Sequence, residues 1–236
     1  MNLILDFGNT LIKVACFENE QLTYFNTGQN LLFIYQIIEE KKPSNIIISS
    51  VTTQHLPLVT LPNVINLTHQ TPLPIKNEYD TPHTLGMDRL AGVIGAMNLF
   101  PETNCLVIDA GTCITYDFIS NDKTYLGGSI SLGSQMRFKA LSNFTNALPL
   151  VEFNPFVSLI GKSTQTAMQS GVFHGILSEM NGIIQSYQAE FGQVQTIICG
   201  GDAKYFESKI KAHIFVDSNL VLSGLHTILR YNISLS

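Results

Sequence analysis

"LILDFGNTLIKVACFENEQLTYF" (residues 3–25) and "LVIDAGTCITYDFISNDKTYLGG" (residues 106–128) are two versions of one pattern, and they decide the fold. Each has an apolar run that ends in an aspartate, then a spacer, a glycine and a nearby threonine. A second apolar run, a polar turn and a third run follow. This order predicts an antiparallel meander of three strands in each half of the chain.

Each meander needs helices to cover it, and the rest of the sequence supplies them. We therefore predict an α/β fold with two related lobes, residues 1–104 and 105–236, whose aspartates Asp6 and Asp109 face each other across a cleft. Helices are expected over residues 30–42, 86–100, 134–148, 164–191, 202–212 and 220–231, and further strands over 45–50, 63–67, 194–199 and 213–216.

Composition and charge exclude several classes of protein. The chain has 236 residues, 45% of them hydrophobic and 13% charged, and a net charge of -5, so it lacks the basic surface of a nucleic-acid-binding protein. No apolar run is long enough to span a membrane, and the N-terminal segment lacks a cationic region. We expect a cytoplasmic protein with small-molecule or protein partners. The four cysteines lie singly in apolar stretches, which predicts buried, reduced thiols.

An acid at the end of a buried strand costs free energy unless a cation or hydrogen bonds offset its desolvation. Gly8 lets the backbone approach a ligand closely, Asn9 and Thr10 offer donors to phosphate oxygens, and Lys13 adds positive charge. A single such turn is more often a turn in which Asp6 or Asn9 hydrogen-bonds to local backbone. Two matching turns favour binding of a nucleotide's phosphates together with a cation.

The sequence does not match two other common nucleotide-binding motifs. The "GKST" at residues 161–164 ends like a phosphate-binding P-loop, but Phe156 occupies the position of its first glycine. The glycine-rich dinucleotide motif G-x-G-x-x-G is also absent from the sequence.

A set of motifs in order carries a resemblance to a known family. "DFGNTLIK" (6–13), "YDTPHTLGMDRLAG" (79–92) and "DAGTCITYD" (109–117) are followed by "GGSISLG" (127–133), "GKSTQTAMQSG" (161–171) and "CGGDA" (199–203). This order resembles the type III pantothenate kinases, members of the actin-like, hexokinase-like and Hsp70-like ATPase superfamily with a ribonuclease H-like fold. The resemblance spans most of the chain.

The resemblance implies ATP-dependent phosphorylation of pantothenate to 4'-phosphopantothenate, the first step of coenzyme A biosynthesis. It also implies Mg²⁺, a monovalent cation (K⁺ or NH₄⁺) and a homodimer. Two alternatives stay open: a kinase for another small hydroxy acid or sugar, and a nucleotide-binding accessory or regulatory protein of the same family.

By the same resemblance, Asp109 would hold the monovalent cation, and Asp6 would bind Mg²⁺ through ATP. The residues implied in binding ATP are Asp6, Phe7, Gly8, Asn9, Thr10, Leu11, Ile12, Lys13, Thr112, Gly200 and Gly201.

Asp88 would be the catalytic base for the pantothenate hydroxyl, because a carboxylate can accept that proton. The residues implied in substrate binding are Tyr79, Gly86, Met87, Asp88, Arg89 and Thr164. Three of them have a plainer reading. Asp88 in the first turn would stabilise any helix through its dipole, Tyr79 could be a packed aromatic, and Thr164 could be a helix N-cap.

The chain departs from the family pattern at two positions. In the loop usually written G-G-x-I-x-P-G, Leu132 stands where proline is expected, which predicts a looser turn beside the substrate. Cys113 replaces a small residue after Thr112, with little effect expected.

Overall fold

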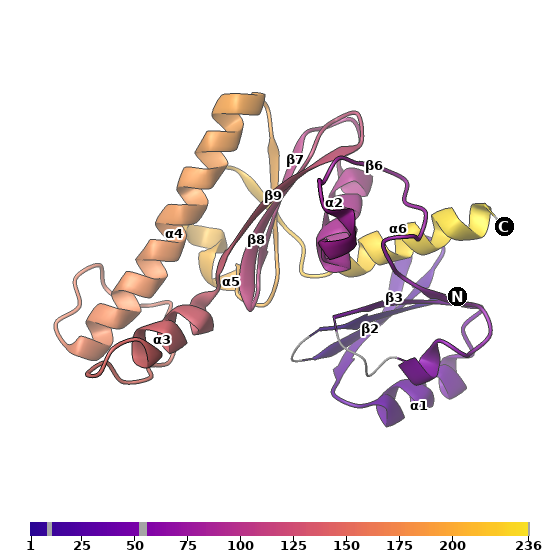
Figure 1. Cartoon of the computed structure of the whole chain (residues 1–236), viewed down its shortest axis with the longest axis horizontal. Helices are drawn as coiled ribbons and strands as arrows, with labels where there is room; N and C mark the ends of the chain where they lie inside the picture. The colour runs from indigo at the N-terminus through magenta and orange to yellow at the C-terminus, as the bar shows by residue number, and fades with distance from the viewer. Residues whose placement is uncertain (9–10, 52–55, 236) are drawn as a thin grey trace. The chain divides into compact units, whose positions relative to one another are not determined.

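The computed structural model describes residues 1–8, 11–51 and 56–235, which group into two compact units (Figure 1). The first unit contains Met1–Pro101, Lys123–Tyr125 and Asn219–Ser236. The second contains Glu102–Asp122 and Leu126–Ser218. A single cut after residue 104 does not describe this grouping, because the C-terminal segment packs with the first unit. The division into two lobes at that residue, and the cleft between them, stay predictions.

The first unit is built on a five-stranded sheet of order β3-β2-β1-β4-β5. Strands β1, β2 and β3 form an antiparallel meander, and β4 and β5 add in parallel beside β1. The bounds are β1 Asn2–Phe7, β2 Ile12–Glu18, β3 Gln21–Gly28, β4 Asn45–Ser50 and β5 Val64–Asn66.

Alternation along β1 gives this sheet two apolar faces. Leu3, Leu5 and Phe7 pack in one cluster with residues of helix α1 (Leu31–Lys41). Ile4 packs in the other cluster with residues of α2 (Met87–Leu99) and α6 (Leu220–Ser234). Asp6, two residues after Ile4, therefore points to the face that α2 and α6 cover.

Helices α2 and α6 approach each other at backbone distance. A Cβ at Gly224 would overlap with the Ala91 carbonyl group, and one at Gly95 would overlap with the Leu220 carbonyl oxygen. In Figure 1 the yellow C-terminal helix α6 runs beside α2. This close packing explains why residues 219–236 group with the first unit, and it fixes the helix that begins with the predicted substrate residues.

The second unit repeats the strand order of the first sheet, as β9-β8-β7-β10-β11. Strands β7 and β8 pair antiparallel, whereas β10 and β11 are parallel to β7. The bounds are β7 Cys105–Ala110, β8 Cys113–Ile119, β9 Thr124–Leu132, β10 Gln195–Cys199 and β11 Ile214–Val216. The first two residues of β9 group with the first unit, where they pair with β6 (Lys76–Asn77).

Helices of the second unit cover one face of its sheet with a single apolar cluster. These helices are α3 (Ser134–Asn143), α4 (Thr164–Phe191) and α5 (Ala203–Phe206). In the described part of the chain, the 3-10 turns are η1 Leu56–Leu58, η2 Pro82–Thr84 and η3 Glu207–Lys209. The matching strand orders confirm the predicted α/β class with two related halves. Helix α4 has its predicted bounds.

Two predicted helices are too long. Helix α3 ends at Asn143 rather than at residue 148, because the Thr145 hydroxyl donates to the Leu141 carbonyl and accepts from the Leu148 amide, which starts a turn. Helix α5 has four residues before η3, whereas residues 202–212 were predicted helical.

The structure tests the predictions made from the apolar runs and from the four cysteines. Within residues 1–8, 11–51 and 56–235, no helix has the length and apolar character to cross a membrane. Cys16, Cys105 and Cys199 are buried, as predicted, but Cys113 is half-buried because it begins β8 at the turn after Asp109.

Candidate active site

The first acidic turn joins β1 to β2. Asp6 lies opposite Lys13 on β2 and Ser49 on β4, so that carboxylate and ammonium side chains share one face of the sheet. The Gly8 amide donates to the Leu11 carbonyl at 3.1 Å and closes the turn. Asn9 and Thr10, two of the predicted phosphate ligands, lie outside the described residues.

The other residues predicted for this turn differ in what they can offer a ligand. The side chains of Phe7 and Ile12 are buried in the core of the first unit, so contact with ATP would have to use their main chain. Leu11 is exposed.

The second acidic turn joins β7 to β8 and is one residue shorter. The last strand pair before the turn is Phe7 with Ile12 in the first unit and Ala110 with Ile114 in the second. Asp109 lies opposite Thr115 and Cys199, and the Gly111 amide donates to the Cys113 carbonyl at 3.0 Å. Thr112 is exposed at its tip.

Two further loops of the second unit meet this turn. The Asp202 amide donates to the Ala110 carbonyl at 2.9 Å, and the Gly133 amide donates to the Thr112 carbonyl at 3.2 Å. The Ser134 hydroxyl donates to Asp202 Oδ2 at 2.6 Å and links the two loops. Sequence reasoning quoted both motifs but missed Ser134 and Asp202, whose spacing of 68 residues gives no local signal.

Gly200 brings the backbone after β10 directly against the acid. Its φ is +90°, a conformation that residues with a Cβ rarely adopt. A Cβ here would overlap with Asp109 Oδ1 and the Ala110 carbonyl oxygen, whereas Gly201 has open space around it. A carboxylate oxygen is thus held among backbone groups at a strand end, and oxygen donors of this kind fit a hard cation such as Mg²⁺. In the described part of the chain, no group of three or more His, Cys, Asp and Glu residues could hold a metal ion.

The predicted substrate residues of the first unit come together at the start of α2. Gly86 is the N-cap and Met87 the first residue, and Asp88 Oδ1 accepts from the Arg89 amide at 2.9 Å. A side chain at Gly86 would overlap with that carboxylate oxygen. The guanidinium carbon of Arg89 lies 5.5 Å from the ring centroid of Tyr79. An acid, a guanidinium, an aromatic ring and helix N-terminal amides therefore gather at one place.

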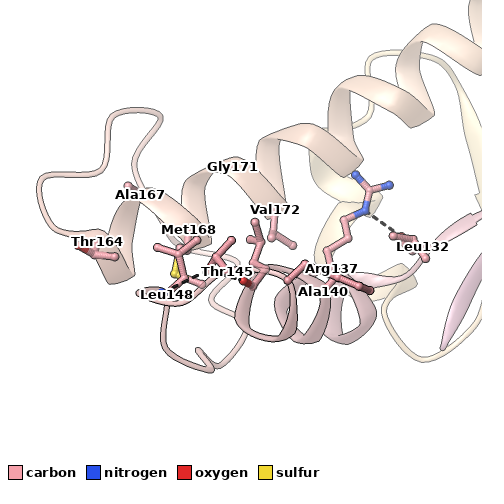
Figure 2. Close-up of a pocket in the computed structure, with 12 residues that line it drawn as sticks. Leu132, Arg137, Ala140, Thr145, Leu148, Thr164, Ala167, Met168, Gly171 and Val172 are labelled. Atoms are coloured by element: carbon pink, nitrogen blue, oxygen red, sulfur yellow. Dashed lines mark hydrogen bonds between the residues drawn. The ribbon is translucent and has the colours of Figure 1, made fainter.

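Thr164, the last predicted substrate residue, is an exposed residue of the second unit. It is the first residue of α4, and the N-cap is Ser163, whose hydroxyl accepts from the Thr166 amide. The plainer reading of Thr164 as N-cap is therefore wrong. Thr164 lines one end of a groove of about 830 Å³ between α3 and α4, and Leu132 and Arg137 line the other end (Figure 2).

Arg137 belongs to a polar network that sequence reasoning missed. It contacts Glu179 Oε2 at 2.5 Å, and the Tyr116 hydroxyl donates to Glu179 Oε1 at 2.8 Å. Burial, together with this hydrogen bond, raises the pKa of Tyr116. Burial would also raise the pKa of Glu179, but hydrogen bonds from Arg137, Tyr116 and Ser131 outweigh it and hold that pKa below its usual value.

Comparison with known proteins identifies the family. The family model "Type III pantothenate kinase" matches residues 2–186. The type III pantothenate kinase of Cytophaga hutchinsonii is 43% identical over 99% of this chain and 100% of its own length. The chain belongs to the type III pantothenate kinase family.

Solved structures agree with the fold of this family. A crystal structure described as a conserved Baf family transcriptional activator from Campylobacter jejuni is 25% identical, with a TM-score of 0.67 over 98% of this chain and 99% of that one. MreB 5 of Spiroplasma citri, solved with AMPPNP, has a TM-score of 0.52 at 12% identity over 99% and 98% of the two chains, which shows the fold alone. The fold of this kinase-family chain is that of the actin-like ATPases.

Substitution of Gly200 by alanine should weaken nucleotide binding, because the new Cβ would displace the Asp109 carboxylate and strain the backbone by about 1–2 kcal/mol. We expect the KM for ATP to rise at least fivefold. Gly201→Ala is the matched control, since a Cβ there meets nothing within 4 Å, and it should change the KM less than twofold. Equal effects of the two variants on the KM for ATP in steady-state kinetics would contradict a role of Gly200 in nucleotide binding.

Proposed function

We propose that this chain transfers the γ-phosphoryl group of ATP to the primary hydroxyl of pantothenate, and that the start of α2 binds the acceptor. The observation that carries the proposal is the cluster of Tyr79, Asp88 and Arg89, in a member of the type III pantothenate kinase family. Pantothenate carries one carboxylate and one primary hydroxyl, and this cluster offers a partner for each.

In the proposed acceptor site, Arg89 and the first amides of α2 bind the carboxylate of pantothenate. The Tyr79 ring lies against the Arg89 guanidinium, which favours a cation there. The Asp88 carboxylate, held by the Arg89 amide, accepts the proton of the attacking hydroxyl. Retention of this acid favours an enzyme over a regulatory binding protein, which would need no base.

The residues proposed to bind ATP and its cations lie at the acidic turn of each unit. Phosphoryl transfer depends mainly on positioning and charge neutralisation, and Mg²⁺ bound with ATP neutralises charge on the β- and γ-phosphates. In the first unit, Asp6 would hold this ion, and Lys13 and Gly8 would contact phosphate oxygens. In the second unit, Asp109 and Thr112 would hold a monovalent cation and the nucleotide. The support is the cross-strand placement of Asp6 opposite Lys13 and the close contact of Asp109 with Gly200. A cytoplasmic location stays a prediction.

Purified protein should release ADP with pantothenate as acceptor in potassium or ammonium buffer, and far more slowly in sodium buffer, because the smaller ion fits a K⁺ site poorly. A coupled ADP-release assay measures this directly. Sugars and other small hydroxy acids serve as acceptor controls. No turnover in any of these buffers would refute the kinase, and equal rates in sodium and potassium would refute the cation site alone.

Asp88→Asn should lower kcat by about 10²- to 10⁴-fold, the usual contribution of a general base. Pantothenate binding, measured by calorimetry, should persist, because the amide keeps the shape of the side chain. Asp80→Asn, a neighbouring acid outside the cluster, is the control and should retain activity. If Asp88→Asn keeps more than a tenth of the parent kcat, Asp88 is not the base.

We propose that the homodimer implied by the resemblance forms on the groove between α3 and α4 in this chain. The groove is mainly apolar, and Phe144 on its rim is 89% exposed. The loop before α4 adds Phe156, which is 92% exposed, and hydrogen bonds from Gln169 and Ser170 of α4 hold this loop. An apolar surface of this kind is typical of a protein interface.

Parent protein should sediment at twice the 26.1 kDa chain mass, whereas Phe156→Ser and Phe144→Ser should shift it towards the monomer at micromolar concentration. Each change removes a large apolar side chain from the proposed interface. Phe25→Ser, at an exposed position of β3 in the first unit, controls for loss of surface apolar area. A monomeric parent would contradict the dimer, and unchanged mass of both variants would place the interface elsewhere.

A further inference from the structure

A polar network joins four elements of the second unit around Arg137. The Arg137–Glu179 network consists of Arg137 on α3, Glu179 on α4, Ser131 on β9 and Tyr116 on β8. Glu179 accepts from all three others, and the side chains of Arg137 and Glu179 are 20% and 25% exposed. The pair is therefore partly shielded from solvent, and its carboxylate is held by more than one donor.

The network also holds the backbone of one loop. Arg137 Nε donates to the Leu132 carbonyl at 2.8 Å, while Nη2 of the same guanidinium reaches Glu179 and Ser131 (Figure 2 shows the bond to Leu132). The rigid plane of the guanidinium thus ties one peptide group to a carboxylate on another helix. Leu132 is the position where the family motif has proline.

The fixed loop touches the second acidic turn. Gly133 follows Leu132, and its amide donates to the Thr112 carbonyl at 3.2 Å. A Cβ at Gly133 would overlap with the carbonyl oxygens of Gly111 and Thr112, so the two loops lie backbone to backbone. A shift of the peptide at Leu132 therefore moves the turn that begins at Asp109.

We propose that Arg137 and Glu179 are positioning residues for nucleotide and monovalent-cation binding, because they fix the Leu132 peptide and, through Gly133, the Asp109–Thr112 turn. In this chain they do what a proline ring would do at position 132. The inference rests on the proposed function in one respect, that the Asp109–Thr112 turn binds the cation and ATP.

If Arg137 and Glu179 only stabilised the fold, their substitution would have a different experimental effect. An ion pair that is partly exposed to solvent contributes little to the stability of a fold. Its loss would then lower the melting temperature and leave ligand constants unchanged in the folded protein. A positioning role changes the constants for the ligands of the turn and spares those of pantothenate, which binds at α2.

The test uses Arg137→Gln and Glu179→Gln in the full-length protein, with Lys139→Gln as the matched control. Lys139 is an exposed cation on the same helix. For both network variants we expect the KM for ATP and the half-activating potassium concentration to rise at least fivefold. The KM for pantothenate should change less than twofold, and Lys139→Gln should change all three less than twofold.

Leu132→Pro in the Arg137→Gln background provides a rescue experiment. The proline ring restricts the loop without the guanidinium, so it should recover at least half of the lost ATP and potassium affinity on a logarithmic scale. If the glutamine variants fail to fold, Arg137→Lys replaces them, because a single ammonium cannot reproduce the planar fork. It should raise the same two constants by at least threefold.

Two results would overturn the proposal. One is that constants for ATP and potassium stay within twofold of the parent in the folded variants. The other is that they rise together with the KM for pantothenate by the same factor, which indicates general damage. A parent protein without turnover would refute the proposed function instead. In that case calorimetry with a nonhydrolysable ATP analogue and Mg²⁺ would measure the dissociation constants of the variants. A rise of at least fivefold over the parent would again support the proposal.

Discussion

Parallel pairing of β7 with β10 is the constraint on which the second unit depends. This pairing places Asp109 beside Cys199, so the first residue after β10 lies directly against the Asp109 carboxylate. That residue is Gly200, whose φ of +90° is a conformation that residues with a Cβ rarely adopt. The Asp202 amide then bonds to the Ala110 carbonyl and Ser134 to the Asp202 carboxylate. Ligand sites in α/β sheets form at the carboxyl ends of strands for this reason, since several loops converge there.

The first unit obeys the same constraint with a different outcome. Asp6 lies one residue before the end of β1, beside Ser49 of β4, but its turn is one residue longer, and its sheet face is covered by α2 and α6. These helices meet through Gly95 and Gly224. The two meanders thus differ in the length of the loop that follows the acid, while the order of their strands is the same. Backbone pairing tolerates little change, and a loop tip tolerates more.

The sequence predicted what local pattern encodes. Strands, meanders and helix α4 follow from apolar periodicity. Tyr79 and Arg89 were both implied in substrate binding by the resemblance, but their contact with each other was not predicted. Helix ends at α3 and α5 were wrong, because a single threonine side chain or a 3-10 turn decides them. The grouping of α6 with the first unit and the ties of Arg137 and Ser134 to residues more than 40 positions away have no local signal.

The exchange of proline for leucine at position 132 illustrates how two devices of similar magnitude can replace each other. Proline at a compatible position stabilises a loop by about 0.4–1 kcal/mol, mainly by restricting the unfolded chain. A partly shielded ion pair with added hydrogen bonds contributes a comparable amount, but in the folded state and in a defined direction. Proline fixes one dihedral angle, whereas the guanidinium of Arg137 fixes the place of the Leu132 carbonyl relative to α4. The leucine that was expected to loosen the turn is therefore held by a bond from the first turns of α3, and the geometry of the acidic turn depends on that helix rather than on a ring.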